Sequence, residues 1–180
     1  MPGGMKLPRI AVALAMLVAP AWAKDAPKAK PKPVTVKLQD ASGKDVGTAT
    51  ITQIAKGVSI KLAVHDLPPG SHAIHVHETA KCDGPDFKSA GGHFNPDHKQ
   101  HGLQNKEGPH AGDMPNFTVD KHGKSIASVV DPNLSLADGD PHSVFTGGGT
   151  ALVIHAKADD MKTDPAGNAG DRIACGTITR

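Results

Sequence analysis

The chain has 180 residues, a formal net charge of +2 at pH 7, and high contents of glycine (20) and proline (15). This length suits one domain with a substantial hydrophobic core. The small charge, with no basic cluster interleaved with aromatic side chains, argues against nucleic-acid binding. The many glycines and prolines favour short strands joined by turns over a helical protein.

The first 23 residues have the pattern of a cleavable export signal. Residues 6–9 carry two positive charges, residues 10–18 are apolar, and residues 21–23 read Ala-Trp-Ala, a small-residue cleavage signal. The apolar stretch is too short to span a bilayer as a helix. We therefore expect residues 1–23 to be a signal peptide removed from a periplasmic or secreted protein that has no membrane anchor. A buried N-terminal helix is the alternative that fits these features less well.

Residues 24–33 are rich in lysine, alanine and proline. Such a composition cannot bury enough apolar surface to fold, so a disordered leader is predicted here. From residue 34 onwards the pattern changes, and we expect a single domain over residues 34–180.

Short strands are predicted throughout this domain. Apolar and polar residues alternate, or short apolar runs occur between turn residues, as in half-buried and buried strands. The predicted strands are 34–38, 48–52, 58–62, 72–77, 116–119, 125–130, 151–155 and 172–179. About eight strands without a convincing helix predict an all-β sandwich or barrel.

Residues 78–115 form the longest stretch without strand or helix periodicity, and they are rich in Gly, Pro, His and Asp. A loop of this length in a compact domain is expected to be functional or held in place. A disulfide and metal ligands could hold it. Residues 131–149 and 159–170 are also predicted to be irregular.

Two cysteines, Cys82 and Cys175, are present. In an exported protein an even pair predicts a disulfide. It would close a long loop, worth about 4–5 kcal/mol in the chain-entropy estimate. A pair of copper-binding thiolates is the alternative, and it is disfavoured because the chain has enough histidine to hold metal without them.

Eleven histidines are present, and their spacing is informative. His75 and His77 project from the same face of one predicted strand, and His155 ends another. The long loop adds three more histidines and an acidic residue, namely His93, His101, His110 and Asp113. Four imidazole nitrogens favour Cu(II), whereas three imidazoles and one carboxylate in a tetrahedral set favour Zn(II).

These seven candidates fall one short of the eight ligand positions that two four-coordinate sites need. One residue would therefore have to serve both metals, and only imidazole has two ring nitrogens suited to that. The count permits a bridging histidine without saying which one it is.

Six segments, in order along the chain, resemble the signatures of the copper/zinc superoxide dismutase family. They are His75-Val76-His77, residues 91–96 (GGHFNP), His101-Gly102, residues 110–116 (HAGDMPN), Ile154-His155-Ala156 and residues 167–176 (GNAGDRIACG). The resemblance runs from about Val34 to the C-terminus. It implies an eight-stranded Greek-key β-sandwich or barrel with long metal-binding and electrostatic loops.

The resemblance also implies a role for each candidate ligand. Copper would be held by His75, His77, His93 and His155, and zinc by His93, His101, His110 and Asp113. His93 would then bridge one copper and one zinc per chain.

Further positions match the family residue by residue. Arg172 corresponds to the arginine beside copper that orients the superoxide anion. Asp159 corresponds to a carboxylate that links a copper histidine to a zinc histidine, with Asp160 as an alternative. Cys82 and Cys175 correspond to the family disulfide.

The implied activity is superoxide dismutation in antioxidant defence. Two superoxide anions and two protons give O₂ and hydrogen peroxide while copper alternates between Cu(II) and Cu(I). His93 would relay a proton, and zinc would support its position. Superoxide is the expected small-molecule partner. A homodimer is one candidate assembly, and the sequence does not determine the oligomeric state.

The alternative functions are those of a copper storage or delivery protein and of a zinc-stabilised adhesion-type sandwich. A delivery protein could lose the bridging histidine or Arg172 and still bind metal, but this chain keeps both. The adhesion hypothesis gives His75, His77 and His155 no purpose. Completeness of the set therefore favours the enzyme.

The chain departs from animal members of the family in its loop lengths. The residues that steer superoxide in those proteins do not transfer, and we consider Lys81 and Lys88 as substitutes. For each single lysine, a solvated surface charge is the better prediction. His72 and His142 are predicted to have structural roles.

Overall fold

The computed structural model describes Met1 and residues 30–180. Apart from Met1, the predicted signal peptide lies outside these described residues, as does most of the predicted leader. Nine strands make up most of the regular structure that is described. They are β1 (Val34–Asp40), β2 (Asp45–Gln53), β3 (Val58–Val64), β4 (Gly70–His72), β5 (Ile74–His77), β6 (Phe117–Val119), β7 (Ser125–Asp131), β8 (Thr150–His155) and β9 (Arg172–Ile178).

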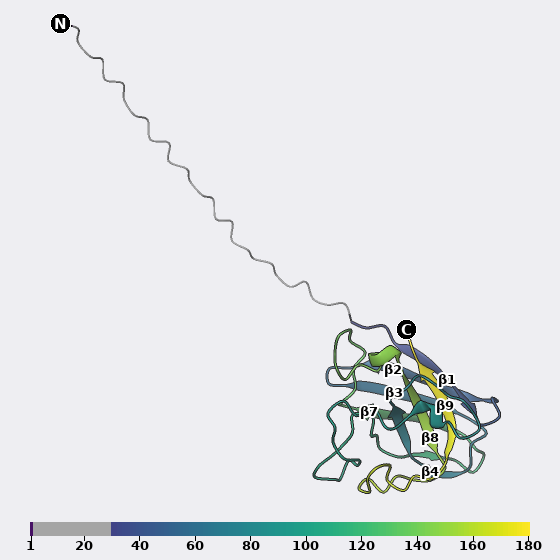
Figure 1. Cartoon of the computed structure of the whole chain (residues 1–180). Coiled ribbons are helices and arrows are strands. Elements are labelled where there is room, and N and C mark those ends of the chain that lie inside the picture. Colours follow the sequence, from purple (N-terminus) through teal and green to yellow (C-terminus); the bar gives the residue numbers. More distant parts are fainter. Residues whose placement is uncertain (2–29) are drawn as a thin grey trace.

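Seven of these strands form one curled antiparallel sheet in the order β5-β8-β9-β1-β2-β3-β7, and β4 pairs with β6 in a second (Figure 1). β7 lies beside β3 although β4, β5 and β6 come between them in the chain, which is a Greek-key type of connection. The predicted all-β class is confirmed. In the described residues, helix is limited to two 3₁₀ turns, Lys88–Ala90 and Thr146–Gly148. Neither is long or apolar enough to cross a membrane.

Residue alternation explains how the sheet forms its core. In β3, the even-numbered residues from Val58 to Val64 are buried, while the odd-numbered residues between them are more exposed. Successive side chains on a strand point to opposite faces, so each strand presents one apolar face to the interior. The described chain buries one large hydrophobic cluster and a second small one around Phe87, next to the disulfide.

The strand predicted at residues 72–77 is divided in two, which gives nine strands instead of eight. The division falls at Ala73, whose backbone N–H donates to Lys157 O and whose carbonyl accepts from His155 N–H. β4 therefore pairs with β6, whereas β5 pairs with β8 in the other sheet. The polar/apolar alternation changes phase at this point, because the apolar residues Ala73 and Ile74 are adjacent between His72 and His75. The sequence thus marks a break, but the change of partner strand is visible only in three dimensions.

The long loop over residues 78–115 lies along the free edge of β5. Phe94 N–H donates to Val76 O at 2.8 Å, and Val76 N–H donates to Gly112 O at 3.0 Å. Gly112 is needed at this close approach, because an added Cβ would lie 2.2 Å from Val76 O. The loop is thus held by backbone hydrogen bonds on both sides of Val76, which brings its polar side chains to the two histidines of β5.

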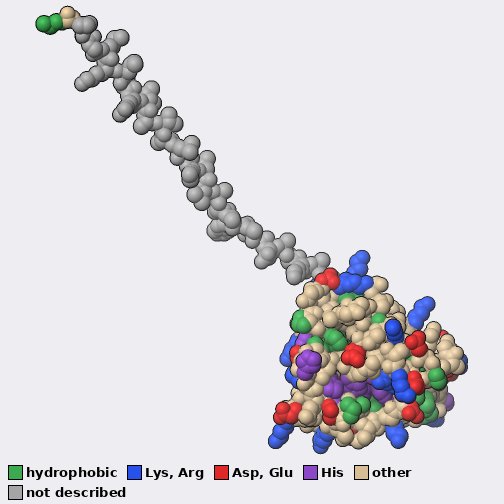
Figure 2. Space-filling model, in the orientation of Figure 1, with side chains coloured by type: hydrophobic (Ala, Val, Ile, Leu, Met, Phe, Trp, Pro, Cys, Tyr) green, Lys and Arg blue, Asp and Glu red, His purple; other side chains and the backbone are tan. Residues whose placement is uncertain are grey.

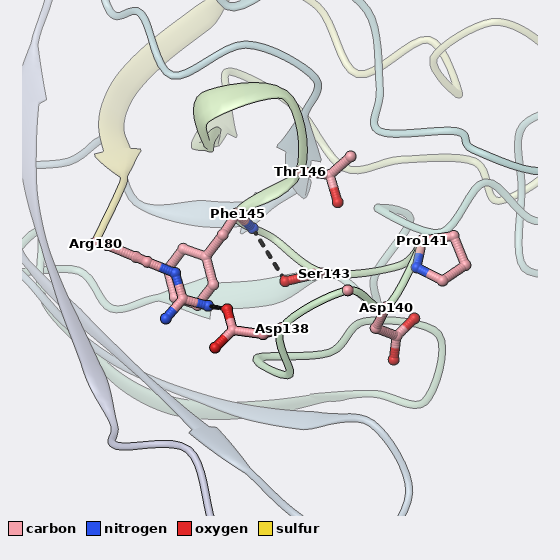
Figure 3. A pocket seen from close by; sticks show the side chains of 8 residues that line it. Asp138, Asp140, Pro141, Ser143, Phe145, Thr146 and Arg180 are labelled. Atoms are coloured by element: carbon pink, nitrogen blue, oxygen red, sulfur yellow. Dashed lines mark hydrogen bonds and ion pairs between the residues drawn. The ribbon is translucent and has the colours of Figure 1, made fainter.

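The loop over residues 132–149 is fastened to the C-terminal residue, away from that edge. Arg180 pairs with Asp138, and its guanidinium lies 4.3 Å from the ring centre of Phe145. Figure 3 shows these side chains around a cavity of about 370 Å³. The C-terminus ends close to the start of β1 (Figure 1).

At the end of β7, Asp131 is fully buried, and its Oδ2 atom has no hydrogen-bond partner. Its Oδ1 atom accepts the N–H of Asn133 at 2.7 Å. Burial raises the pKa of Asp131 to about 7, against the opposing effect of the Asn133 hydrogen bond and with a smaller contribution from the charge of Asp113. The native state therefore keeps a proton on Asp131 at pH values where the unfolded chain has lost it.

This raised pKa predicts a pH-dependent stability. A carboxyl whose folded pKa exceeds its unfolded value lowers stability as pH rises from about 4 to about 7, with no further change above. Asp131→Asn removes the titration and keeps the acceptor for Asn133. We expect the variant to exceed the wild type at pH 8 by up to about 4 kcal/mol, from about three pKa units at 1.36 kcal/mol each.

Urea unfolding of both proteins between pH 5 and pH 8 measures this difference. The advantage of Asp131→Asn should shrink as the pH falls. A difference that stays constant over this range would contradict a neutral Asp131.

Candidate metal centre

Four buried histidines meet beside β5. His75 and His77 come from alternate positions of this strand, and His155 comes from the end of the neighbouring β8. His93 comes from the long loop, where it pairs with His77 across the strand edge. Each of the four offers a ring nitrogen, and these nitrogens all lie within 4.8 Å of one another.

The free ring nitrogens of this cluster are its most informative feature. In the described residues, five buried side-chain N or O atoms lack a hydrogen-bond partner, and four of them belong to these histidines. They are His75 Nδ1, His77 Nε2, His93 Nε2 and His155 Nε2. An unpaired buried polar atom is costly. Four together, all imidazole nitrogens, form a donor set that fits copper.

The opposite ring nitrogens are held by the protein, which fixes how each ring is turned. His75 Nε2 lies 2.9 Å from Asp159 Oδ2, His77 Nδ1 lies 3.0 Å from Gly91 O, and His155 Nδ1 lies 3.3 Å from Gly170 O. Such bonds to the second nitrogen set the tautomer of a metal-binding histidine. The free nitrogens are therefore oriented before any metal binds.

A second cluster gathers around the carboxylate of Asp113. Its Oδ1 atom lies 2.8 Å from His93 Nδ1, 2.9 Å from His101 Nδ1 and 3.3 Å from His110 Nδ1. Its Oδ2 atom accepts the backbone N–H groups of Gly102 and His110, each at 2.9 Å. Three imidazole nitrogens and one carboxylate oxygen are a donor set that fits zinc.

His75 competes with His110 for a place in this second set. Distance alone groups His75 with His93, His101 and Asp113 within 4.8 Å. The Nε2 atom of His75 is engaged by Asp159, however, and its free Nδ1 atom belongs to the first cluster. His110 has no such conflict, and its Nδ1 atom is 3.4 Å from His93 Nδ1. Hydrogen bonding therefore favours His110.

His93 takes part in both clusters through different atoms. Its Nδ1 atom faces Asp113, and its Nε2 atom is one of the four free nitrogens. Of the seven ligand candidates, His93 is the residue whose two ring nitrogens face the two donor sets.

Asp159 joins the clusters from the other side. Its carboxylate is buried between His75 Nε2 and His101 Nε2, at 2.9 Å from each through Oδ2. Asn116 holds it there, because its amide oxygen accepts from Asp159 N–H and its amide nitrogen donates to Asp159 O. Asp160, the alternative to Asp159, is exposed and bonds to Thr163 in its own loop.

The two clusters differ in charge. Burial lowers the pKa values of all four histidines of the first cluster, to about 4 for His93 and His155, so these rings stay neutral and able to bind metal. Burial acts the same way on His101, but its hydrogen bonds to Asp113 and Asp159 outweigh this effect and raise its pKa to about 9. Without zinc, the second cluster is therefore an ionic network, and His101 must lose its extra proton to bind the metal.

One arginine, Arg172, lies beside the first cluster. Arg172 donates through Nη1 to Phe87 O and through Nη2 to Gly91 O, both at 2.7 Å. A cavity of about 400 Å³ is lined by Arg172 together with His77, His93 and His155. Figure 2 shows histidine side chains gathered on one face of the molecule, with basic side chains nearby. The cavity is suited to a small anion that can reach the free nitrogens.

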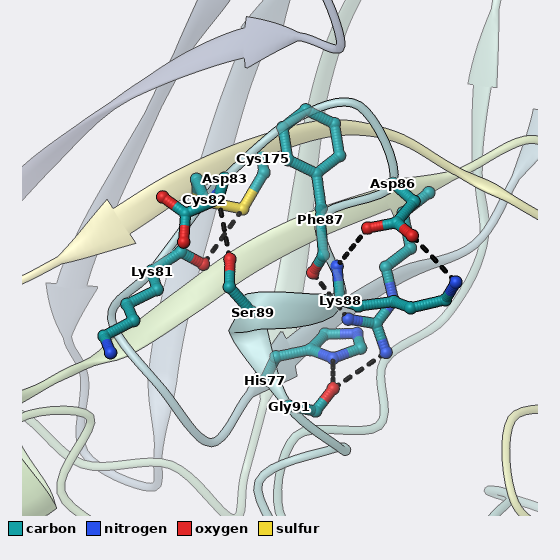
Figure 4. Close-up of a disulfide and its surroundings, with 11 residues drawn as sticks. His77, Lys81, Cys82, Asp83, Asp86, Phe87, Lys88, Ser89, Gly91 and Cys175 are labelled. Atoms are coloured by element: carbon teal, nitrogen blue, oxygen red, sulfur yellow. Dashed lines mark hydrogen bonds and ion pairs between the residues drawn. A yellow bond between two sulfur atoms is a disulfide. The ribbon is translucent and has the colours of Figure 1, made fainter.

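The loop that supplies both carbonyls is tied to the sheet by a disulfide. Cys82 and Cys175 are bonded, with their Cα atoms 5.6 Å apart, so neither offers a thiolate to a metal (Figure 4). Cys175 packs with Phe87 in the small hydrophobic cluster. The disulfide thus lies beside the segment that holds Arg172.

Other candidates lie outside the clusters. Lys88 pairs with Asp86 at 2.7 Å, which offsets its charge, and Lys81 is exposed. His72 and His142 are hydrogen-bonded to backbone carbonyls, as expected for structural residues. Sequence reasoning gave no role to Asn116, although it ends one of the motifs, and none to the carbonyl of Phe87.

Comparisons with known proteins agree with this geometry. Residues 46–178 match the family described as copper/zinc superoxide dismutase. The chain belongs to this family. A copper/zinc superoxide dismutase of Aquifex aeolicus is 56% identical over 137 residues, which cover 76% of this chain and 81% of that one.

Solved structures give the same result. The copper/zinc superoxide dismutase of Brucella abortus is 32% identical with a TM-score of 0.68, over 82% of this chain and 99% of that chain. A superoxide dismutase-like protein of Bacillus subtilis is 41% identical with a TM-score of 0.77, over 80% and 97%. The chain is thus an oxidoreductase that disproportionates superoxide with copper and zinc.

Proposed function

We propose that His75, His77, His93 and His155 hold the copper of this superoxide dismutase, and that His93, His101, His110 and Asp113 hold its zinc. The observation that carries this assignment is the set of four buried, unpaired ring nitrogens. The carboxylate of Asp113, in contact with three Nδ1 atoms, supports the zinc set. Asp159 orients one histidine of each set.

When bound, copper supplies the one-electron redox chemistry, and zinc is redox-inert. His93 Nε2 has no hydrogen-bond partner within the protein, so this nitrogen would take up a proton when it is not bound to copper and would pass it to the reduced substrate. Arg172 offers a permanent positive charge and a planar fork to the superoxide anion. Its two bonds to backbone carbonyls hold that fork in place at the cavity.

We propose that the protein is exported and works in the periplasm or outside the cell, with residues 1–23 as signal peptide, 24–33 as leader and 34–180 as the catalytic domain. The disulfide supports an oxidising compartment.

Mass spectrometry of the exported protein should show a mature N-terminus at Lys24. Absorbance at 280 nm should be very low, because the single Trp is removed and the chain has no Tyr. Light scattering of the same sample tests the homodimer.

Pulse radiolysis of protein carrying one copper and one zinc per chain tests the site. We expect superoxide decay near about 10⁸–10⁹ M⁻¹s⁻¹, slowing as salt rises because the anion is attracted electrostatically. Tight copper binding without any acceleration would instead favour a storage or delivery protein.

Arg172→Ala should slow this decay by roughly 10- to 100-fold, the range for a lost charge-assisted hydrogen bond of about 1.5–3 kcal/mol. Copper content should not change, because the guanidinium contacts carbonyls and not the free nitrogens. Lys121→Ala, an exposed lysine of the β6–β7 turn, is the matched control for charge. An Arg172→Ala rate equal to that of this control at every ionic strength would remove Arg172 from the mechanism.

A further inference from the structure

The polar loop after β8 packs directly against the segment that carries His101 and His110. Gln104 N–H donates to Met161 O at 2.9 Å, and Asn105 Nδ2 donates to Lys162 O at 3.3 Å. Gly102 allows this approach, because an added Cβ would lie 2.3 Å from Met161 O. The two loops therefore form one packed unit around the zinc-side donors.

Asp164 is the acidic residue of the polar loop that faces both of these histidines. Its Oδ1 atom accepts the backbone N–H of His101 at 2.6 Å, across 63 positions of sequence. The same atom lies 3.8 Å from His110 Nε2. The Nδ1 atom of His110 faces Asp113, so Asp164 stands at the ring nitrogen on the side away from the donor set.

This arrangement parallels that of Asp159 on His101. There a carboxylate holds the Nε2 atom of a ring whose Nδ1 atom faces Asp113. Carboxylates at the second nitrogen of metal-bound histidines fix the ring and increase its basicity, and their loss costs roughly 10- to 100-fold in metal affinity. Each of the two histidines thus has a carboxylate facing its Nε2 atom, on the side of the ring away from Asp113.

We propose that Asp164 is a positioning residue for zinc, acting on the ring of His110 by its charge and on the backbone of His101 by its hydrogen bond. This inference rests on the proposed zinc set. Asp164 contacts neither the free nitrogens nor Arg172, so its effect is confined to zinc. Its side chain is 48% exposed, so solvent partly screens the electrostatic interaction between its charge and His110. The expected effect is therefore at the low end of the range for such partners.

Zinc affinity, measured by competition with a chromophoric chelator, tests the proposal without using activity. Asp164→Ala should weaken zinc binding by about tenfold, with copper content unchanged. Asp164→Asn keeps an acceptor for His101 N–H and loses the charge, so its zinc affinity should lie between wild type and Asp164→Ala. Glu107→Gln is the matched control, because it removes one exposed negative charge from the segment between His101 and His110, against which the loop of Asp164 packs.

A further variant separates this inference from the assignment on which it rests. If His110→Ala leaves zinc affinity unchanged, the proposed zinc set is wrong. If His110→Ala weakens zinc but Asp164→Ala matches Glu107→Gln, the zinc set stands and the role of Asp164 is overturned. If Asp164 acts through His110, the loss of zinc affinity caused by Asp164→Asn should be smaller in the His110→Ala background, because the imidazole on which it acts is then absent. Full additivity would instead exclude action through His110.

Discussion

Replacing His93 with alanine is expected to remove dismutase activity and zinc binding together. His93 Nδ1 faces the Asp113 carboxylate, while its Nε2 atom faces the free nitrogens of His75, His77 and His155. Loss of one imidazole therefore takes a donor from both sets. Because even an outer hydrogen-bond partner of a metal ligand is worth roughly 10- to 100-fold, zinc affinity should fall by more than about 100-fold.

The comparison that makes this result specific is His155→Ala. His155 belongs to the first cluster and has no contact with Asp113, so its loss should weaken copper and leave zinc in place. Copper and zinc contents of the purified variants, with chelator competition for each metal, provide the measurement. His98→Asn serves as control, since His98 is an exposed loop histidine whose positive φ of 53° asparagine tolerates.

Full zinc affinity in His93→Ala would falsify the bridging assignment, and His75 would then have to complete the zinc set. If His93→Ala loses zinc but keeps the wild-type rate of superoxide decay, the role of His93 Nε2 in proton transfer is contradicted.

The strand that carries His75 and His77 could be predicted because strand periodicity is local. Residues i and i+2 point the same way wherever the strand lies, so a pair of ligands on one face follows from spacing. The hydrophobic alternation of β3 likewise determines which side faces the core. These features do not depend on which distant segment packs against them.

The parts that could not be predicted depend on contacts between distant segments. Ala73 ends a strand because its backbone groups bond to Lys157 and His155. The alternation changes phase at Ala73-Ile74, but no local signal shows which distant segments these groups bond to. Asp164 was one acidic residue among several in a polar loop, and only the fold brings it to His101. The resemblance to a known family supplied the ligand set, but it said nothing of Asp164, nor of Phe87, whose carbonyl holds Arg172.

Breaking the Cys82–Cys175 disulfide is expected to lower the free energy of unfolding by several kcal/mol. The bond closes a loop of 93 positions, which corresponds to about 4–5 kcal/mol in the chain-entropy estimate. Reduction of the wild-type protein tests this without leaving a cavity in the small cluster of Phe87 and Cys175. Urea unfolding of oxidised and reduced protein gives the difference in unfolding free energy, and thiol labelling confirms the redox state.

The double variant Cys82→Ser/Cys175→Ser provides the control. It should unfold near the reduced wild type and show no further change when reductant is added. If reductant shifted its transition as well, the effect would arise elsewhere than at the disulfide. An unmoved transition of the wild type on confirmed reduction would mean that the bond contributes nothing to folding stability.

Reduction should also slow superoxide decay, because the disulfide ties down the segment that holds Arg172. Arg172 is held by the carbonyls of Phe87 and Gly91, and both belong to the segment that Cys82 ties to β9. Gly91 O also lies 3.0 Å from His77 Nδ1 (Figure 4). Release of this segment loosens the anion site before it removes any metal donor. Metal content should therefore survive reduction while the rate falls, and the rate of Arg172→Ala should respond to reduction much less than that of the wild type.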